Sequence, residues 1–586
     1  MAKTCFSLAL TGSGGAGVMT AGQILLDAAA RSGLYGLMVR SLGPQIRGGE
    51  SAAILRIGTA PVSSLGDTCS VLVAVDWGNI ERFADEIPLD ENSLVIADPD
   101  QGEVPPVIVA KSPKIAFVPL KALADTVPGG RVNMIALGLA AALAGFDEAV
   151  VAEAIQASLG RKSQEVVDIS LQTLRAGMGA ATAVRSEAPE IADLACGCSA
   201  PAPDNGKHRR WLLSGNAATG LGILRGGVRY CAAYPITPAT EVLEWLAGAL
   251  PKVGGALVQA EDELASINMV VGGSFAGIPS MTATSGPGLS LMVETLGLAV
   301  AAEIPLVVCN VMRGGPSTGI PTKSEQSDLN IALFGLHGDA PHVVTAATDI
   351  RDCLFTGQWS VQLAEAMQTP VIMLTDQAMG QAQAVIEPLE ASPQKTERLV
   401  PSENTPNYQR YAVTNSGVSP MAIPGMKGCA YTADGLEHSP LGRPSTQARD
   451  HQDQLDKRAR KIEAHDYGDA WADIDGEGEI ALLTFGSLTG VAREAAETLR
   501  ARGVPVRVIA LRLLMPLRTE DLKRALQGVR RVLVIEQNHS RQFLAYLKST
   551  FDFEAEVVSC ARPGPVPIRP QEIVTAATSR DMGDTK

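Results

Sequence analysis

Four short apolar runs, each followed at once by polar or charged residues, constrain the fold of this chain more than any other feature. They occupy residues 230–233, 256–258, 279–283 and 305–310. Segments long enough for helices separate them, and strands that alternate with helices predict a parallel sheet. The carboxyl ends of such strands meet at one edge of the sheet, where open α/β folds bind ligands. We therefore expect the residues after these runs to form one site.

The residues that follow the runs are types that bind ligands. Tyr-Pro-Ile-Thr-Pro at 234–238 follows the first run, Gln-Ala-Glu-Asp-Glu at 259–263 the second, and Arg313 lies after the fourth, before two glycines. Arginine donates paired hydrogen bonds to a carboxylate, and a threonine hydroxyl adds another donor. The pattern indicates a site for a small anionic substrate and an aromatic cofactor.

Structural alternatives exist for some of these residues. Thr237 could serve a turn or a helix cap before Pro238. Asp262 and Glu263 could be acidic residues that the dipole of a helix favours at its first turn. Neither explanation accounts for Glu261.

The length and punctuation of the chain predict several domains. A chain of 586 residues exceeds what one hydrophobic core supports, so three or four domains are expected. Strand and helix patterns place α/β domains at 1–185, 208–382 and 476–586. Residues 186–207, rich in Ala, Pro, Asp and Gly, predict a linker, and 383–475 predict an extended arm that ends in a charged helix.

A glycine loop at 12–17 follows the first predicted strand and fits G-x-G-x-x-G. A dinucleotide fold would place an acidic residue at the end of the second strand, but Arg40 is found there, which disfavours NAD. Gly14 and Gly15, with Arg40 and Arg47, would instead suit a phosphorylated ligand such as coenzyme A. The alternative is that the glycines serve tight packing of strand against helix.

Composition and charge exclude several classes of function. The net charge of −14 and the 4% of aromatic residues argue against a nucleic-acid partner. We find no apolar run long enough to span a membrane and no signal peptide, so a cytoplasmic protein is expected. The nine cysteines are scattered, and only Cys196 and Cys198 are close together. We expect free thiols, with no metal or iron–sulfur cluster in this chain.

The order of the motifs resembles a known family. The chain is similar to the α subunit of 2-oxoacid:ferredoxin oxidoreductases, most like the 2-oxoglutarate type, with the γ domain of that family fused at its N-terminus. The resemblance covers nearly the whole chain. It rests on the glycine loop, Ser-Leu-Gly-Pro-Gln-Ile-Arg-Gly-Gly at 41–49, Gly-Asn-Ala-Ala at 215–218, the motifs at 234–238 and 259–263, Thr-Ser-Gly-Pro-Gly at 284–288, Arg-Gly-Gly-Pro-Ser-Thr-Gly-Ile-Pro-Thr at 313–322 and Phe-Gly-Ser at 485–487.

The resemblance implies a fold and site residues. It implies a multi-domain α/β protein of open parallel sheets, in which 208–382 bind the pyrimidine end of thiamine diphosphate and 476–586 are transketolase-like. Glu261 would activate the pyrimidine ring, while Thr237 and Arg313 would hold the carboxylate of the 2-oxoacid. Further contacts would come from Tyr234, Pro235 and Ile236 to thiamine and from Thr322 and Lys323 to the far end of the substrate.

The resemblance also implies partners. Gly-Asp-Gly, the signature that holds Mg²⁺ on the diphosphate, occurs nowhere in this chain. In the family, Mg²⁺ and a [4Fe-4S] cluster belong to the β subunit, so activity is expected only with that subunit. Ferredoxin would accept the electrons, and a dimer of αβ heterodimers is expected. One departure from the family is Ser-Pro-Met at 419–421, where an arginine is expected third.

Three alternatives to a 2-oxoglutarate enzyme remain open from the sequence. The enzyme could be the pyruvate or branched-chain 2-oxoacid version. The first glycine loop could serve an NADP-linked dehydrogenase, which would leave the residues after 208 without a role. The chain could also be a scaffold subunit whose motifs serve assembly.

Overall fold

The computed structural model describes residues 5–43, 49–187, 210–390 and 397–579. The chain forms two compact units. The first consists of Met1–Ser214 with two short later segments, Gln381–Pro388 and Pro565–Gln571. The second contains the remaining residues. The predicted linker at 186–207 and its two cysteines lie outside the described residues, except for its first two residues, which end a helix.

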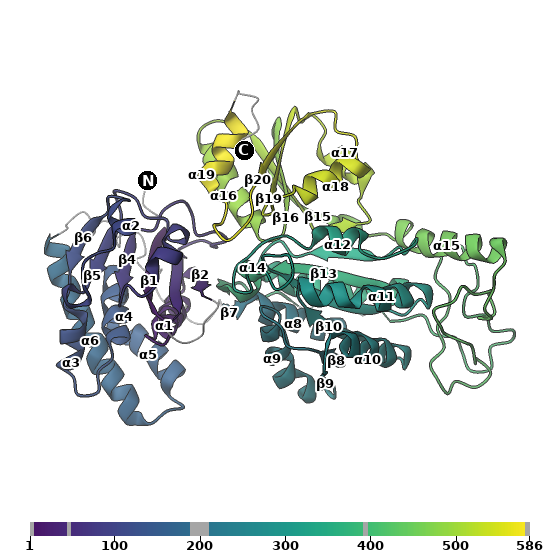
Figure 1. The fold of residues 1–586 in the computed structure, drawn as a ribbon, viewed down its shortest axis with the longest axis horizontal. Coiled ribbons are helices and arrows are strands. Elements are labelled where there is room, and N and C mark those ends of the chain that lie inside the picture. Colours follow the sequence, from purple (N-terminus) through teal and green to yellow (C-terminus); the bar gives the residue numbers. More distant parts are fainter. Residues whose placement is uncertain (1–4, 44–48, 188–209, 391–396, 580–586) are drawn as a thin grey trace. The chain divides into compact units, whose positions relative to one another are not determined.

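The first unit is built on an eight-stranded mixed sheet with the strand order β6-β5-β4-β1-β3-β2-β14-β7. Helices α1 and α4–α6 lie along one side of it (Figure 1). The strands are β1 (Cys5–Ser13), β2 (Tyr35–Leu42), β3 (Glu50–Gly58), β4 (Val71–Ala74), β5 (Leu94–Ala97), β6 (Lys114–Phe117), β7 (Trp211–Ser214) and β14 (Gln383–Ile386). The helices are α1 (Val18–Arg31), α2 (Pro106–Val109), α3 (Leu120–Asp125), α4 (Val132–Leu143), α5 (Glu148–Leu159) and α6 (Gln164–Glu187).

Alternation along the central strand β1 explains the two layers on this sheet. Leu8 and Leu10 belong to the apolar core shared with α1 and α4, whereas Ala9 belongs to a second core on the opposite face, with Phe83 and Ile108. Successive side chains of a strand point to opposite faces, so both faces of β1 are buried.

Two features of the first sheet differ from the predictions. Strand β3 pairs antiparallel with both β1 and β2 and lies between them, so the sheet is mixed and the second predicted strand is not adjacent to the first. Strands β7 and β14 also pair with this sheet, although the boundaries predicted at 208 and 382 place β7 in the next domain and β14 in the arm. Backbone pairing at a sheet edge has little sequence signal, because both strands are four residues long.

The second unit contains a seven-stranded sheet of order β18-β12-β13-β11-β10-β8-β9, parallel except for the edge strand β18. Its strands are β8 (Tyr230–Ala233), β9 (Ala256–Gln259), β10 (Ser280–Thr284), β11 (Leu306–Met312), β12 (Val343–Ala346), β13 (Pro370–Asp376) and β18 (Leu513–Met515). Its helices are α8 (Gly215–Gly226), α9 (Thr240–Ala249), α10 (Glu263–Phe275), α11 (Gly286–Ala301), α12 (Leu329–Phe334), α13 (Ile350–Met367) and α14 (Gln377–Gln381).

A five-stranded sheet of order β15-β17-β16-β19-β20 completes the second unit. It is parallel except for the edge strand β15. Its elements are β15 (Ala472–Asp475), β16 (Ile480–Phe485), α16 (Leu488–Ala501), β17 (Val506–Leu511), α17 (Thr519–Ala525), β19 (Arg531–Glu536), α18 (Gln542–Thr550), β20 (Glu556–Ala561) and α19 (Pro570–Thr578). The predicted multi-domain α/β class is thus confirmed, although each of the three sheets also contains antiparallel pairs.

The described part of the predicted arm is held by a buried ionic cluster. Helix α15 (Ala448–Glu463) places Lys457 and Lys461 against Glu303, with Nζ–Oε distances of 2.6 and 2.9 Å. Arg410, also buried, donates to the Glu303 carbonyl oxygen over 2.8 Å. Burial alone would raise the pKa of Glu303, but the three cations hold it well below its usual range. Burial lowers the pKa of Lys457 to about 8 despite the attraction of Glu303.

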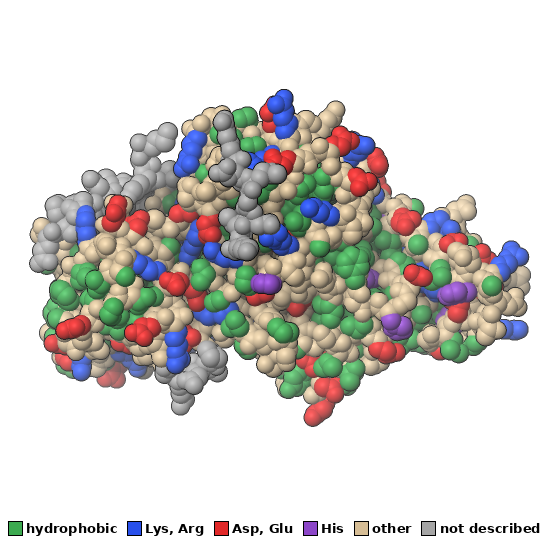
Figure 2. Space-filling model, turned by 45° about the horizontal axis from the view of Figure 1, so that its top comes forward, with side chains coloured by type: hydrophobic (Ala, Val, Ile, Leu, Met, Phe, Trp, Pro, Cys, Tyr) green, Lys and Arg blue, Asp and Glu red, His purple; other side chains and the backbone are tan. Residues whose placement is uncertain are grey.

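Two properties bear on the possible partners of the chain: the charge of its surface and the apolar length of its helices. On the face shown in Figure 2, acidic and basic side chains are interspersed. Among the described residues, no helix is both long enough and apolar enough to cross a membrane.

Replacing Glu303 should release the arm. In Glu303→Gln the buried ammonium groups of Lys457 and Lys461 lose their carboxylate, and breaking a buried ion pair costs about 3–5 kcal/mol. We expect faster trypsin cleavage within 397–447 and a lower unfolding midpoint. Asp453→Asn, which removes an exposed pair with Arg449 on the same helix, is the control and should change the midpoint little. Equal cleavage of both variants would contradict this role for Glu303.

Candidate functional site

The four parallel strands β11, β10, β8 and β9 are neighbours in the seven-stranded sheet, so the segments that follow them lie along one edge. These segments are the ones singled out in the sequence. Backbone pairing continues one residue past β9, where the Ala260 N–H donates to the Ala233 carbonyl over 3.0 Å. Glu261 and the 234–238 turn therefore start side by side.

Arg313 and Thr237 are in direct contact. The Arg313 guanidinium donates from Nη1 to the Thr237 carbonyl oxygen over 2.5 Å. The Arg313 residue is only 5% exposed, and burial lowers the pKa of its guanidinium, while Asp328 opposes this effect. Its buried Nε has no hydrogen-bond acceptor among the described residues, and the exposed Thr237 hydroxyl makes no hydrogen bond to them. Both residues therefore keep a donor unused by the described residues, and their contact holds the two residues together at the strand ends.

The loop after Arg313 folds back on itself. Gly314 N–H donates to the Lys323 carbonyl over 3.1 Å, and Ile320 N–H donates to the Gly314 carbonyl over 2.8 Å. Gly319 has a φ of +51°, and a Cβ there would collide with the Gly314 carbonyl, so glycine is required. This fold buries Lys323 and leaves the Thr322 hydroxyl buried without a partner among the described residues.

The three acidic residues at 261–263 have different roles. Asp262 caps helix α10, its Oδ1 accepting from the Ala265 N–H over 2.7 Å, and Glu263 is buried at the first position of the helix. Glu261 is exposed, and no described residue donates to its carboxylate. The helix-start explanation therefore fits Asp262 and Glu263 and leaves Glu261 available for a ligand. Tyr234, on the neighbouring turn, is 40% exposed, while Pro235 and Ile236 are half-buried.

Asp328 is a site residue that the sequence did not predict. Its carboxylate accepts from the Asn310 amide over 2.9 Å and from the Gly286 N–H. Burial raises its pKa to about 6, against these hydrogen bonds and the nearby Arg313. The only available signal was an aspartate before the apolar residues of a short helix, which usually indicates a cap. Here the side chain instead binds the ends of β10 and β11 together.

The polar end of strand β19 contacts other protein segments. Glu536 accepts from the N–H groups of Phe543 and Leu544, at 2.7 and 3.0 Å, and so fixes the start of α18. Gln537 and Asn538 are buried. These three polar residues are therefore packed against other parts of the protein.

The predicted coenzyme A residues lie in the first unit. Much of the glycine loop is bonded internally: the Ser13 N–H and hydroxyl donate to the Asp76 carboxylate over 2.8 Å each, and the Gly14 N–H donates to the Gly49 carbonyl over 2.7 Å. Gly15 has a φ of +102° and open space beside it. Arg40 is half-buried in β2, and Arg47 lies outside the described residues. The N–H groups of Ser13 and Gly14 are therefore bonded within the protein.

The Ser-Pro-Met departure falls inside the core. Met421 is fully buried, and its sulfur lies 3.7 Å from the Arg398 guanidinium. Arg398 in turn pairs with Glu365 through two hydrogen bonds of 2.8 and 2.9 Å. Position 421 therefore faces the protein interior.

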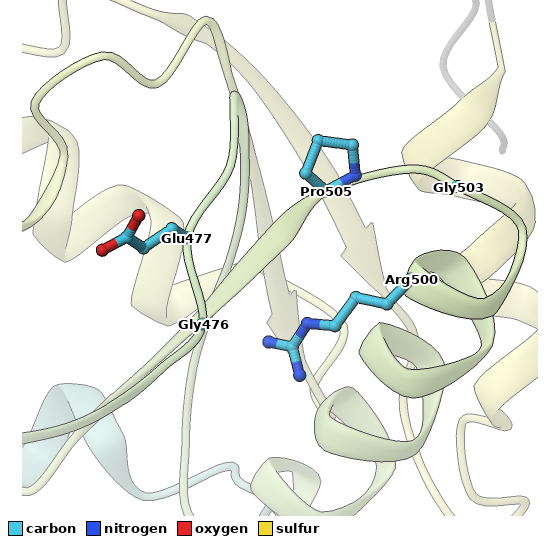
Figure 3. Close-up of a pocket in the computed structure, with 5 residues that line it drawn as sticks. All are labelled: Gly476, Glu477, Arg500, Gly503 and Pro505. Carbon is cyan, nitrogen blue, oxygen red and sulfur yellow. The ribbon is translucent and has the colours of Figure 1, made fainter.

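An open hollow lies away from these residues, on the domain of the five-stranded sheet (Figure 3). It is lined by Gly476, Glu477, Arg500, Gly503 and Pro505. Arg500 is already engaged by Asp475 and by the Val506 carbonyl, at 2.8 and 3.1 Å. The hollow therefore offers no free cation to an anionic ligand.

Three family models match successive parts of the chain. Residues 7–180 match the pyruvate ferredoxin/flavodoxin oxidoreductase domain, and residues 221–457 match the thiamine diphosphate-binding domain of pyruvate flavodoxin/ferredoxin oxidoreductases. Residues 471–575 match the C-terminal domain of transketolase. The thiamine-binding and transketolase-like domains are thus both confirmed.

Two relatives match over most of the chain. The α subunit of 2-oxoacid:ferredoxin oxidoreductase 2 from Aeropyrum pernix is 31% identical, over 93% of this chain and 92% of its own. The chain belongs to this family of α subunits. The α subunit from Saccharolobus solfataricus is 29% identical over 92% of both chains.

A solved structure of the same family also aligns with this chain. The 2-oxoglutarate:ferredoxin oxidoreductase of Magnetococcus marinus, solved with 2-oxoglutarate, coenzyme A and succinyl-CoA bound, is 32% identical. It aligns with a TM-score of 0.86 over 98% of this α subunit and 99% of its own chain. Membership of this family removes the NADP-linked dehydrogenase alternative.

The raised pKa of Asp328 predicts a pH-dependent stability. The folded state binds its proton more tightly than the unfolded chain, whose aspartate pKa is about 3.9, so this residue destabilises the fold as pH rises from about 4 to 6. The free energy of unfolding of Asp328→Asn should therefore rise, relative to that of the wild type, by roughly 2–3 kcal/mol across that interval. Unfolding midpoints of both proteins, measured from pH 4 to 7, test this. A constant difference would contradict it.

Proposed function

We propose that this chain is the α subunit of an enzyme that oxidatively decarboxylates 2-oxoglutarate. The overall reaction consumes the 2-oxoacid, coenzyme A and two oxidised ferredoxins, and it yields acyl-CoA, CO₂, a proton and two reduced ferredoxins. It could also run in reverse as a carboxylation. The observation that carries the proposal is the contact of Arg313 with Thr237, beside the unpartnered Glu261, at adjoining strand ends.

The residues present fit the pyrimidine end of thiamine diphosphate. Glu261 offers a carboxylate that no described residue occupies, and the turn of Tyr234, Pro235 and Ile236 follows the adjacent strand β8. When bound, thiamine diphosphate supplies a carbon nucleophile for the keto carbon and holds the electrons left when CO₂ departs. Glu261 would share a proton with a ring nitrogen of the pyrimidine and so keep the ring oriented.

Arg313 and Thr237 would hold the oxoacid. The free Nε–H of Arg313 and the Thr237 hydroxyl are donors suited to the carboxylate next to the keto group. Because Arg313 is bonded to the backbone of Thr237, the two donors are fixed relative to each other, which lowers the entropy cost of aligning the substrate. Thr322 and Lys323 would contact the far carboxylate of 2-oxoglutarate.

The remaining parts of the reaction would lie outside this chain or in its first unit. The absence of Gly-Asp-Gly supports a β subunit that carries Mg²⁺ and a [4Fe-4S] cluster, from which electrons pass to ferredoxin. We infer a dimer of αβ heterodimers. Gly14, Gly15, Arg40 and Arg47 are proposed for coenzyme A, which the Magnetococcus relative binds.

The pyruvate and branched-chain versions are a second candidate, because the Aeropyrum pernix and Saccharolobus solfataricus relatives are named for 2-oxoacids in general. Comparing kcat/KM for 2-oxoglutarate, pyruvate and a branched-chain 2-oxoacid in the assembled enzyme decides between them. A higher value for either of the other acids would reassign the substrate.

Removing the Glu261 carboxylate should abolish turnover. In Glu261→Gln, oxoacid-dependent viologen reduction should fall by about 100- to 10,000-fold, because proton transfer at the pyrimidine is lost. Assembly with the β subunit should persist, because no contact of the described fold depends on this side chain. Asp262→Asn, which keeps the helix cap, is the matched control and should retain activity. Normal turnover in Glu261→Gln would refute the assignment.

Removing the Arg313 guanidinium should weaken oxoacid binding selectively. Hydrogen bonds to a charged partner are worth about 1.5–3 kcal/mol each, so Arg313→Ala should raise the oxoacid KM about 10- to 100-fold. The KM for coenzyme A should not change. Steady-state kinetics with each substrate varied in turn measure both values, and an unchanged oxoacid KM would exclude Arg313 from the site.

A further inference from the structure

The segment that follows the Arg313 loop, residues 324–330, is held by the five-stranded sheet. Gln326 is almost fully buried, at 1% exposure. Its Oε1 accepts from the Gln537 N–H over 2.9 Å, and its Nε2 donates to the Phe485 carbonyl over 2.9 Å. Its own N–H donates to the Gln537 carbonyl over 2.8 Å. One side chain thus bridges the carboxyl ends of β16 and β19.

A second glutamine makes the reciprocal contact. Gln542, the first residue of α18, donates from Nε2 to the Ser327 carbonyl over 3.0 Å. Its Oε1 accepts from the Asn330 N–H over 2.9 Å. Gln542 is itself fixed, because its N–H donates to the Asn538 side chain over 3.1 Å. Two side chains therefore bind the segment to the five-stranded sheet domain. Gln326 belongs to the segment, and Gln542 comes from α18.

Ser327 connects these contacts to the clamp. Its carbonyl accepts from Gln542, and its hydroxyl donates to the Arg313 carbonyl over 2.8 Å. The next residue, Asp328, is bonded to Asn310 at the end of β11. The position of the Arg313 backbone is thus set from two sides, by its own strand and by the five-stranded sheet.

The sequence at the end of β16 is adapted to this contact. Gly486 has a φ of +69°, and a Cβ there would lie 2.6 Å from Nε2 of Gln326. A larger residue would displace the glutamine. The Phe-Gly-Ser motif at 485–487 therefore has a physical role in the approach of this sheet to the segment.

We propose that Gln326 and Gln542 are positioning residues for Arg313, through which the transketolase-like domain sets the geometry of the oxoacid site. Neither side chain touches the proposed substrate donors. They act by fixing Ser327, whose hydroxyl holds the Arg313 backbone. The inference rests on the proposed function of Arg313 and adds that the last domain of the chain controls oxoacid affinity.

The test uses the enzyme assembled with its β subunit. Gln326→Ala and Gln542→Ala should each raise the oxoacid KM about tenfold, because a small misplacement of a binding group is costly. The coenzyme A KM and kcat at saturating oxoacid should stay within about twofold of wild type. In an Arg313→Ala background neither glutamine variant should raise the oxoacid KM further, since both act through the same group.

Arg493→Gln is the matched control. Arg493 joins the same two parts of the second unit, pairing with Asp349 and Asp473, but contacts none of residues 313–330. It should lower stability without changing the oxoacid KM. Gln542→Ala, on a partly exposed residue, keeps the test valid if Gln326→Ala fails to fold.

The outcomes separate the two proposals. If Arg313→Ala raises the oxoacid KM while both glutamine variants leave it unchanged, the positioning role is wrong and the proposed function stands. The same conclusion follows if the glutamine variants raise both KM values equally, or if their effects add fully to that of Arg313→Ala. If Arg313→Ala itself has no effect on the oxoacid KM, the proposed function of Arg313 fails.

Discussion

The second unit depends on one apolar core that runs through both of its sheets. Val308 of β11 and Leu483 of β16 belong to the same buried cluster, and Leu513 and Leu514 carry it across the junction. Strand β18 adds a backbone contact by pairing antiparallel with β12. Polar contacts such as those of Gln326 can be precise only because this core already holds the two sheets at a fixed separation.

Much of this fold follows from sequence periodicity. The apolar runs at 230–233, 256–258, 279–283 and 305–310 lie within two residues of strands β8, β9, β10 and β11 at both ends, because each is followed by a change of polarity. The placement of site residues after parallel strands follows from the same pattern. Thr237 and Arg313 lie together for that reason.

The features that the sequence could not predict depend on contacts between residues that are far apart along the chain. No local signal places β3 between β1 and β2, or joins β14 to β7, because the partners of a strand are set by the whole sheet. Asp328 was overlooked since its partners, Asn310 and Gly286, come from other strand ends. No local signal predicts that Asp76, far along the chain, accepts the hydrogen bonds of the Ser13 N–H and hydroxyl in the glycine loop.

The pairing of β7 with β14 bears on how the chain is put together. Ser214 lies opposite Gln383 in this pair, so the chain leaves the first sheet and returns to it at neighbouring positions. In topological terms, the thiamine-binding domain is inserted into the turn of an edge hairpin. Insertions are tolerated where the two ends of the inserted segment lie close together. The pair of β7 and β14 therefore lets the first sheet carry a large inserted domain without any break in its strand pairing.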